Sequence, residues 1–250
     1  SIEFKHNKEH KHRALNLDDN GVCDACRAAE DKERIDWKKR EDELLKLLDK
    51  HRRNDGQYDC IVPGSGGKDS ALTGILCRKA CDNVTGLIMP CHSRRNYEAD
   101  AADAEIVAKK FGIRTLRVDL TPVRDALVLS MQDSCALTAQ ALANVAPRLR
   151  MTTLYAAGQS MNCLVAGTGN RSEAYMGYFT KWGDGAHDFN PIADLTVREV
   201  YEFLRYLGAP ERIIKKAPSA GLFDGQTDEG EMGLLYSQID DYLLEEKGDP

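Results

Sequence analysis

The chain has 250 residues, of which 42% are hydrophobic and 30% are charged, and its formal net charge is −6 at pH 7. This length is enough for one α/β domain with a full core and a small appendage. The negative charge argues against a protein that coats nucleic acid, and no apolar run approaches the roughly 20 residues that a membrane-spanning helix needs. The 8 cysteines come without a secretory pattern, which favours a reducing cytoplasm.

The first quarter of the chain differs from the rest in its high content of charged residues. We therefore predict a charged N-terminal extension over residues 1–57 and a main domain over residues 58–250. From Asp36 to Arg53, apolar residues recur at helical spacing, which predicts an amphipathic helix. Asn54-Asp55-Gly56 is expected to end that helix.

In the main domain, short apolar runs alternate with helical patterns. We predict strands over residues 58–62, 84–89, 115–118 and 162–166, helices over residues 69–80, 98–111 and 121–160 with a break near Pro147, and a helical tail from Thr196. This alternation is typical of the α/β class with a doubly wound parallel sheet. Ligands of such sheets bind at the carboxyl ends of the strands.

A glycine-rich loop stands between the first predicted strand of the main domain and the helix that follows. The residues of this loop that we expect to bind phosphate groups are Gly64, Ser65, Gly66, Gly67, Lys68, Asp69 and Ser70. Successive small residues let backbone N–H groups converge on an anion, and the helix N-terminus adds partial positive charge. Among so many phosphate donors, the Asp69 carboxylate is best explained as a ligand of Mg²⁺.

Two common phosphate motifs do not fit this loop. A P-loop with its Gly-Lys-Ser/Thr ending requires glycine at position 62 and Ser or Thr after Lys68, and the chain has Val62 and Asp69 there. The dinucleotide fingerprint requires glycine at position 69. A glycine-rich turn that only reverses the chain leaves Asp69 and Ser70 unexplained.

The segment 65–70 (SGGKDS) resembles the pyrophosphate loop of the N-type ATP pyrophosphatases. Those enzymes split ATP between the α and β phosphates and form adenylated intermediates. They include NAD, GMP, argininosuccinate and asparagine synthetases, tRNA-thiolating enzymes and sugar amidotransferases. The loop by itself does not choose among them.

Four later segments resemble ammonia-dependent NAD synthetases in order and spacing. They are residues 144–150 (NVAPRLR), 167–173 (GTGNRSE), 177–188 (GYFTKWGDGAHD) and 217–229 (APSAGLFDGQTDE). The resemblance extends over about residues 58–244. It implies a Rossmann-like (adenine nucleotide alpha hydrolase-like) fold, a homodimer, and the ATP-dependent amidation of nicotinic acid adenine dinucleotide by ammonia through an adenylate.

The resemblance also implies a role for individual residues. Asp69 and Glu173 are expected to hold Mg²⁺ and, with Lys181, to be the catalytic residues. Thr168 and Ser219 are expected to contact ATP. The substrate-binding residues that it implies are Arg148, Lys181 and Asp188. Taken singly, each of these charged residues also fits an ordinary surface ion pair or a helix-end position.

The chain departs from the NAD synthetase pattern at three places. Val197 stands where the family usually carries an ATP-contacting lysine, with Arg198 next to it, and the family's C-terminal His-Lys pair has no counterpart. Lys68 is more typical of thiolating and sugar-amidating relatives. Val197 and the missing His-Lys pair leave a non-catalytic ATP-binding paralogue as an alternative, whereas Lys68 favours a sugar amidotransferase.

The N-terminal extension suggests another enzyme. Residues 18–37 and 58–63 resemble the start of N-acetyl-sugar amidotransferases, which form acetamidino sugars of surface polysaccharides. Cys23 and Cys26 have the spacing of half a Zn²⁺ site, although two ordinary thiols on a turn are the simpler interpretation. The chain shows no pattern of an attached glutaminase, so ammonia is expected to be free or to come from a separate glutaminase.

Overall fold

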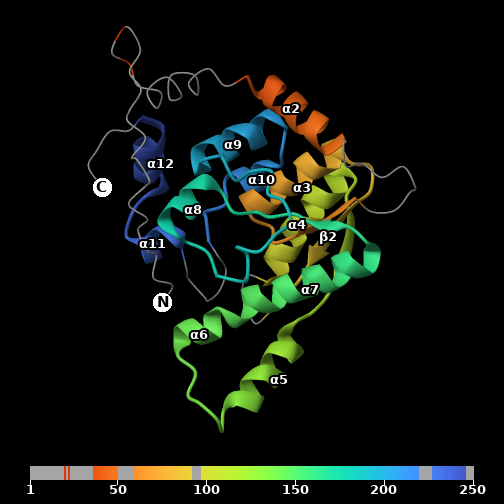
Figure 1. Ribbon diagram of the computed structural model, residues 1–250, viewed down its shortest axis with the longest axis vertical. Coiled ribbons are helices and arrows are strands. Elements are labelled where there is room, and N and C mark those ends of the chain that lie inside the picture. The colour runs from red at the N-terminus through yellow and green to blue at the C-terminus, as the bar shows by residue number, and fades with distance from the viewer. Residues whose placement is uncertain are drawn as a thin grey trace, which may run out of the picture.

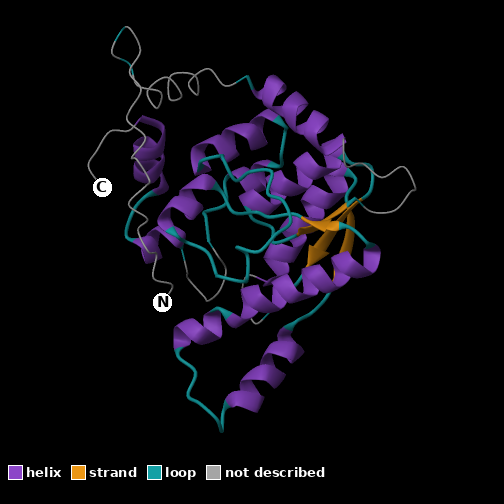
Figure 2. Cartoon of the chain, in the orientation of Figure 1, coloured by secondary structure: helices purple, strands orange, loops and turns teal. Residues whose placement is uncertain are grey.

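The computed structural model describes residues 20, 22, 36–49, 59–91, 97–219 and 227–245. Within these residues the centre of the fold is a parallel sheet. Its strands are β1 (Cys60–Pro63), β2 (Val84–Ile88), β3 (Arg114–Arg117) and β4 (Leu164–Val165), in the order β3-β2-β1-β4. All three strand pairs are parallel. Figure 2 shows the sheet in orange, surrounded by helices.

The connections between the strands make the sheet doubly wound. Helices α3 (Lys68–Ala80) and α4 (Tyr97–Phe111) carry the chain outward from β1 to β3. Helices α5 (Thr121–Met131), α6 (Ala139–Ala143) and α7 (Val145–Met161) then return it to β4, on the other side of β1. The strand order therefore reverses between β1 and β4, which is where such sheets bind ligands.

Buried side chains of β1 alternate between the two faces of the sheet. Cys60 and Val62 pack with residues of α3 and α4, whereas Ile61 packs with residues of α7 on the opposite face. The period of two that defines a strand thus gives each face its own hydrophobic core. Helices cover both faces, in agreement with the continuous apolar character of β1.

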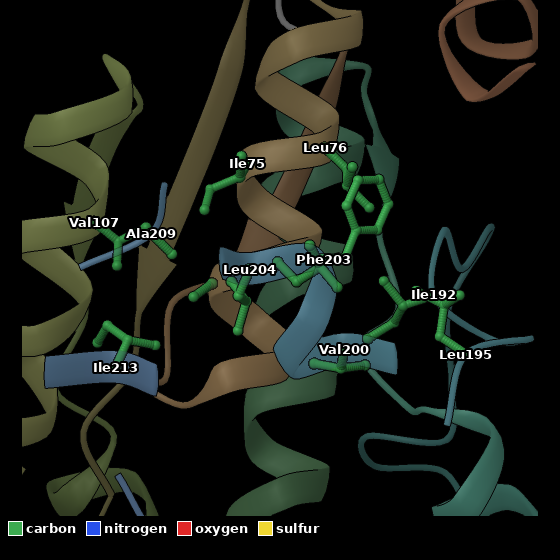
Figure 3. Close-up of a cluster of buried hydrophobic side chains, with 12 residues drawn as sticks. Ile75, Leu76, Val107, Ile192, Leu195, Val200, Phe203, Leu204, Ala209 and Ile213 are labelled. Atoms are coloured by element: carbon green, nitrogen blue, oxygen red, sulfur yellow. The ribbon is translucent and has the colours of Figure 1, made fainter. Parts of the chain in front are cut away.

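The described residues of the C-terminal third of the chain add five helices. These are α8 (Arg171–Met176), α9 (Val197–Tyr206), α10 (Glu211–Ile214), α11 (Asp228–Met232) and α12 (Tyr236–Glu245). Of these, α9 and α10 pack against α3. Figure 3 shows Phe203 and Leu204 of α9 packed against Ile75 and Leu76 of α3, in the largest buried cluster. This packing fixes α9 and the loops around it relative to the helix that follows the glycine loop.

The predicted N-terminal helix is observed as α2 (Trp37–Asp49), which packs on the main domain (Figure 1). The Trp37 ring stacks on Phe203 with 4.6 Å between centroids, and Glu41 pairs with Lys79 at 2.5 Å. Cys23, Cys26 and most of the segment 1–57 lie outside the described residues, so the domain boundary at 57/58 stays a prediction. In the described part of the chain, no helix is long and apolar enough to cross a membrane.

The prediction of a doubly wound α/β fold is confirmed, and the structure corrects one predicted element in detail. The alanine-rich region 121–160 has a break near Pro147, at Asn144, but it also has an earlier break and therefore forms three helices. The first interruption falls at residues 132–138, and Pro147 lies inside the first turn of α7, where its missing N–H breaks no helical hydrogen bond. The predicted strand 162–166 is shorter, because Asn162 takes a left-handed conformation that ends α7.

Candidate active site

The glycine loop links the buried end of β1 to the first turn of α3. The hydroxyls of Ser65 and Ser70 lie 2.8 Å apart, and the Gly67 N–H donates to Ser65 Oγ at 3.3 Å. Among the described residues, no acceptor meets the backbone N–H groups of Lys68, Asp69 or Ser70. The loop therefore presents several free donors at the N-terminus of a 13-residue helix, which is the arrangement that binds phosphate groups.

Gly66 is held tightly against the first turn of α4. Its φ is +76°, and a Cβ atom at this position would lie 2.2 Å from the Asp100 carbonyl oxygen. Any side chain here would clash with backbone, and the left-handed conformation would add strain. Glycine at position 66 is thus required by the shape of the loop.

The Asp69 carboxylate connects the glycine loop to the second glycine loop, 167–170, which follows β4. One oxygen accepts a hydrogen bond from Asn170 Nδ2 at 3.1 Å, and the other lies 2.7 Å from Lys68 Nζ. Thr73 Oγ1 of α3 also donates to the Gly167 carbonyl at 3.2 Å. Two loops that are about a hundred residues apart in the chain thus meet at the switch point of the sheet.

Lys68 is the most buried charged group of this site, with 5% of its surface exposed. Its ammonium lies beside Asp69 and 5.4 Å from the centre of the Tyr236 ring. Burial by itself lowers the pKa of Lys68, but the nearby carboxylates of Asp69 and Glu173 outweigh that effect and raise it. Lys68 is therefore a permanent cation next to the loop's phosphate donors.

Glu173 lies in the first turn of α8 and forms a capping box with Asn170. The Asn170 side chain accepts from the Glu173 N–H at 2.9 Å, and Glu173 Oε2 accepts from the Asn170 N–H at 3.0 Å. Burial and the neighbouring Asp69 carboxylate raise the pKa of Glu173 to about 8, despite the opposing effect of Lys68. Asn170 therefore contacts both predicted metal ligands at once.

This pair of carboxylates fits Mg²⁺ bound together with a nucleotide. The described residues contain no cluster of three or more His, Cys, Asp or Glu side chains that could hold a metal ion. Mg²⁺ commonly takes one or two carboxylates, several waters and the phosphates of its substrate. The negative charge of Asp69 disfavours a second negative charge on Glu173. A divalent cation bound by both carboxylates would relieve this repulsion.

The predicted substrate residues gather around the start of α7. Arg148 Nε donates to the Lys181 carbonyl at 3.2 Å, and Thr180 Oγ1 lies 2.5 Å from Asn144 Oδ1. The segments 144–150 and 177–188, which were selected from the sequence separately, are thus in contact. The Lys181 side chain is exposed, and Trp182 beside it has φ +61°, a conformation that non-glycine residues rarely adopt.

Asp188 lies at the edge of this group and is bound to β4. Its two oxygens accept from the Val165 N–H at 2.8 Å and from Tyr155 Oη at 3.2 Å. Thr168 is part of the second glycine loop, and Ser219 lies at the last described position before residues 220–226. The roles of Asp188, Thr168 and Ser219 in binding stay predictions.

Val197, which stands where a lysine was expected, is the first residue of α9. Val197 is buried with Tyr236 and Ile239, and 4% of its surface is exposed. The neighbouring Arg198 forms an ion pair with Asp241 of α12, and its N–H donates to Asp240 Oδ2 at 2.7 Å. Arg198 thus connects α9 to α12, whereas the cation beside Asp69 comes from Lys68 of the loop itself.

Sequence reasoning missed two residues of the site. Asn170 stood inside a recognised segment but was given no role, although Asn as a helix N-cap followed three residues later by Glu173 is a readable capping signal. Lys216 also went unnoticed, and its ammonium donates to the Gly66 carbonyl at 3.1 Å. No local pattern marks that contact, because 150 residues separate its two partners.

Comparisons with known proteins place the chain in a family. Residues 38–250 match the family model described as NAD synthase. The NH(3)-dependent NAD(+) synthetase of Carboxydothermus hydrogenoformans is 48% identical over 218 residues, which cover 86% of this chain and 88% of that protein. That of Pyrococcus horikoshii is 42% identical, covering 81% of this chain and 77% of the relative.

Solved structures give the same result. The NMN synthetase from Francisella tularensis superposes with a TM-score of 0.78 at 37% identity, covering 86% of this chain and 89% of that chain. The NH3-dependent NAD synthetase from Campylobacter jejuni superposes with a TM-score of 0.67 at 31% identity, with the same coverage. These findings favour an NAD synthetase over the sugar amidotransferase and the non-catalytic paralogue. The chain belongs to the NAD synthase family of carbon–nitrogen ligases.

Proposed function

We propose that the protein amidates nicotinic acid adenine dinucleotide with ammonia, consuming ATP and producing NAD, AMP and pyrophosphate. One observation carries this proposal for a member of the NAD synthase family. The two glycine loops meet at the switch point of the sheet, where Asn170 Nδ2 lies 3.1 Å from Asp69 Oδ1. That contact places the free N–H donors at the start of α3 beside the carboxylates that suit Mg²⁺.

The reaction has two steps that such a site can accelerate. An oxygen of the nicotinate carboxylate attacks the α-phosphorus of ATP, and the bond to the β-phosphate oxygen breaks to release pyrophosphate. Ammonia then attacks the acyl carbon of the adenylate, loses a proton, and displaces AMP. The first step brings a carboxylate toward a polyanion, so positioned cations and N–H donors stabilise its transition state.

The proposed roles of the ATP-side residues follow from the contacts of the loop. The N–H groups of Lys68, Asp69 and Ser70 bind the phosphates that leave as pyrophosphate, and the Lys68 ammonium offsets their charge. Asp69 and Glu173 are the proposed Mg²⁺ ligands, and the bound ion supplies further neutralisation of the phosphates. Thr168 and Ser219 are proposed ATP contacts, on the strength of the resemblance.

The residues at the start of α7 are proposed to bind the second substrate. Arg148 and Lys181 present two cations from adjacent backbone segments, and the dinucleotide carries a pyrophosphate and a carboxylate that such cations attract. Lys181 is also the proposed catalytic residue on this side of the site. Asp188 is proposed to contribute to substrate binding while it anchors its loop to β4.

A homodimer is proposed for the assembly. Helix α5 has 11 residues and buries none of them, while Val123, Leu127 and Leu129 are 50%, 38% and 63% exposed. Figure 1 shows α5 and α6 at one end of the molecule, away from the sheet. Isolated helices of this length are marginal in water, so a second copy that covers the apolar side chains would stabilise them.

Ammonia itself is the proposed nitrogen donor, because the two curated relatives compared above are named as NH(3)-dependent synthetases. A separate glutaminase that releases ammonia is the alternative supply. The cytoplasm is the proposed compartment. Cys60, Cys77, Cys81 and Cys91 are buried in the hydrophobic core, where a thiol packs as a small apolar group.

A second candidate substrate is the mononucleotide. The Francisella tularensis protein named NMN synthetase superposes with a TM-score of 0.78, against 0.67 for the Campylobacter jejuni NAD synthetase. The amidation chemistry is the same for both substrates, since each carries the nicotinate carboxylate. They differ in the adenylyl half, which only the dinucleotide can place on the protein.

A product assay tests the proposal. Purified protein with ATP, Mg²⁺ and ammonium is given nicotinic acid adenine dinucleotide or nicotinic acid mononucleotide in parallel. The proposal predicts NAD, AMP and pyrophosphate in equal amounts, with a higher kcat/KM for the dinucleotide. A higher kcat/KM for the mononucleotide would select the second candidate, and no amide from either substrate would reject both.

A further inference from the structure

Lys216 lies just after α10, at the start of the segment that leads to Ser219. Its ammonium donates to three oxygen atoms: the Gly66 carbonyl at 3.1 Å, Asp100 Oδ1 at 2.6 Å and Asp103 Oδ2 at 2.9 Å. Its own carbonyl accepts from Tyr201 Oη of α9 at 3.1 Å. Lys216 is therefore fixed at both ends, between the glycine loop, α4 and α9.

The Gly66 carbonyl is the functionally important partner in this group. It belongs to the peptide between Gly66 and Gly67, and glycine residues allow such a peptide to rotate into either orientation with little steric cost. Rotation of this peptide would turn the Gly66 carbonyl oxygen from the α4 side to the phosphate side of the loop. An oxygen there would repel a phosphate, whereas the ammonium of Lys216 keeps that oxygen on the α4 side.

We propose that Lys216 is a positioning residue for ATP, which holds the Gly66 carbonyl against α4 and so keeps the glycine loop in the shape that receives pyrophosphate. The inference rests on the proposed function, in which this loop binds ATP. In this proposal Lys216 acts through the loop, because its ammonium already donates to three protein oxygens. Lys216 also joins the glycine loop to the segment that carries Ser219, which is itself a proposed ATP contact.

The same cluster provides matched controls. Asp103 is 3% exposed, and its second oxygen forms an ion pair with Arg212. In the described part of the chain, no hydrogen bond or ion pair joins Arg212 to the glycine loop. Arg212→Met therefore removes one cation from the buried carboxylate and leaves Gly66 untouched. Lys215→Met removes the neighbouring lysine, whose side chain is 77% exposed and pairs with Glu211 at 3.3 Å.

The test is calorimetric binding of ATP and of inorganic pyrophosphate, together with KM for ATP and for the nicotinate substrate. For Lys216→Met we expect both binding constants and the KM for ATP to worsen by on the order of tenfold, the size of one charge-assisted hydrogen bond. The KM for the nicotinate substrate stays within about twofold. Arg212→Met and Lys215→Met bind ATP like the wild type, and Lys216→Arg binds it more tightly than Lys216→Met.

A double variant keeps the test decisive if Lys216→Met fails to fold. D100N/K216M removes one charge of each sign and retains the Arg212–Asp103 pair, so no buried carboxylate is left alone. It is expected to show the same loss of ATP affinity. Wild-type affinity in either variant, or an equal loss in Arg212→Met, would overturn the role of Lys216. A wild-type protein that binds neither ATP nor pyrophosphate would reject the proposed function, and this inference with it.

Discussion

The side-chain amide of Asn170 donates a hydrogen bond to Asp69 across 3.1 Å, and its oxygen caps the helix that carries Glu173. One neutral residue thus orients both proposed metal ligands, from loops at the ends of two neighbouring strands, β1 and β4. Its side chain is fully buried, with 0% of its surface exposed. The positions of the two carboxylates are therefore set by the fold before any ligand binds.

The two contacts of Asn170, with Asp69 and with the N-terminus of α8, can be removed separately by substitution. Asn170→Ser keeps an oxygen that can cap α8 but removes the amide that reaches Asp69. We expect kcat to fall on the order of tenfold while the midpoint of urea unfolding stays close to that of the wild type. Asn170→Ala removes both contacts and should also destabilise the protein by about 1 kcal/mol. If Asn170→Ser retained full activity, its amide would have no part in orienting Asp69.

Asp69 is predicted to be indispensable for turnover. Asp69→Asn keeps the size of the side chain but removes a proposed Mg²⁺ ligand, and it leaves the Lys68 ammonium with one carboxylate fewer. We expect kcat/KM to fall on the order of a hundredfold or more, measured as pyrophosphate release at saturating Mg²⁺. Asp82→Asn is the control, because Asp82 is a highly exposed carboxylate after α3. Equal activity of the two variants would refute the metal role of Asp69.

The raised pKa of Glu173 predicts a pH-dependent stability in the absence of ligands. The folded protein keeps this proton up to about pH 8, whereas the unfolded chain releases it near the ordinary value of 4.5. Protonated Glu173 therefore contributes stability below that lower value, and the contribution is lost as the pH rises through about 8. The slope is at most about 1.4 kcal/mol per pH unit.

Chemical unfolding between about pH 5 and about pH 8.5 measures this effect. Glu173→Gln carries no titrating proton, so its unfolding free energy should change less over this range than that of the wild type. Mg²⁺ with ATP should also flatten the wild-type curve, since the cation favours the charged carboxylate. Parallel curves for the wild type and Glu173→Gln would show that Glu173 titrates near its ordinary pKa.

The apolar face of α5 predicts how the proposed dimer can be dissociated. Leu129 is 63% exposed, and Leu129→Asp places a charge in the middle of the proposed interface. We expect analytical ultracentrifugation to show a shift from dimer to monomer, with a dissociation constant raised on the order of a hundredfold. Leu235→Asp is the matched control, since Leu235 is 52% exposed but lies between α11 and α12. A monomeric wild type would exclude this interface.

Much of the architecture could be predicted because its signals are local. The apolar strand, the glycine loop and the helix after Gly67 follow one another directly, and their meaning depends on a few adjacent residues. Glycine at position 66 is required by a positive φ and by the close approach of Asp100, and the sequence already marks it as a loop position. The alternation of strands and helices likewise predicts that the two glycine loops lie at the same edge of the sheet.

Other features depend on contacts between distant parts of the chain. The sequence of the segment 121–160 predicts a break only near Pro147, and the further break at residues 132–138, after which Thr138 caps α6, is seen only in the structure. Arg198 stands next to the expected lysine position, but only the packing of α9 on α12 shows that it pairs with Asp241. The hydrogen bond from Lys216 to Gly66 forms only because the residues after α10 lie against α4 and the glycine loop.

The central claim is that the glycine loop supports formation of an adenylate, and isotope exchange between pyrophosphate and ATP tests it most directly. In the absence of ammonia, the account predicts that labelled pyrophosphate enters ATP only when nicotinic acid adenine dinucleotide or the mononucleotide is present, and that Asp69→Asn abolishes the exchange. ATP cleavage to ADP and phosphate, or amide formation without any exchange in the absence of ammonia, would contradict the account.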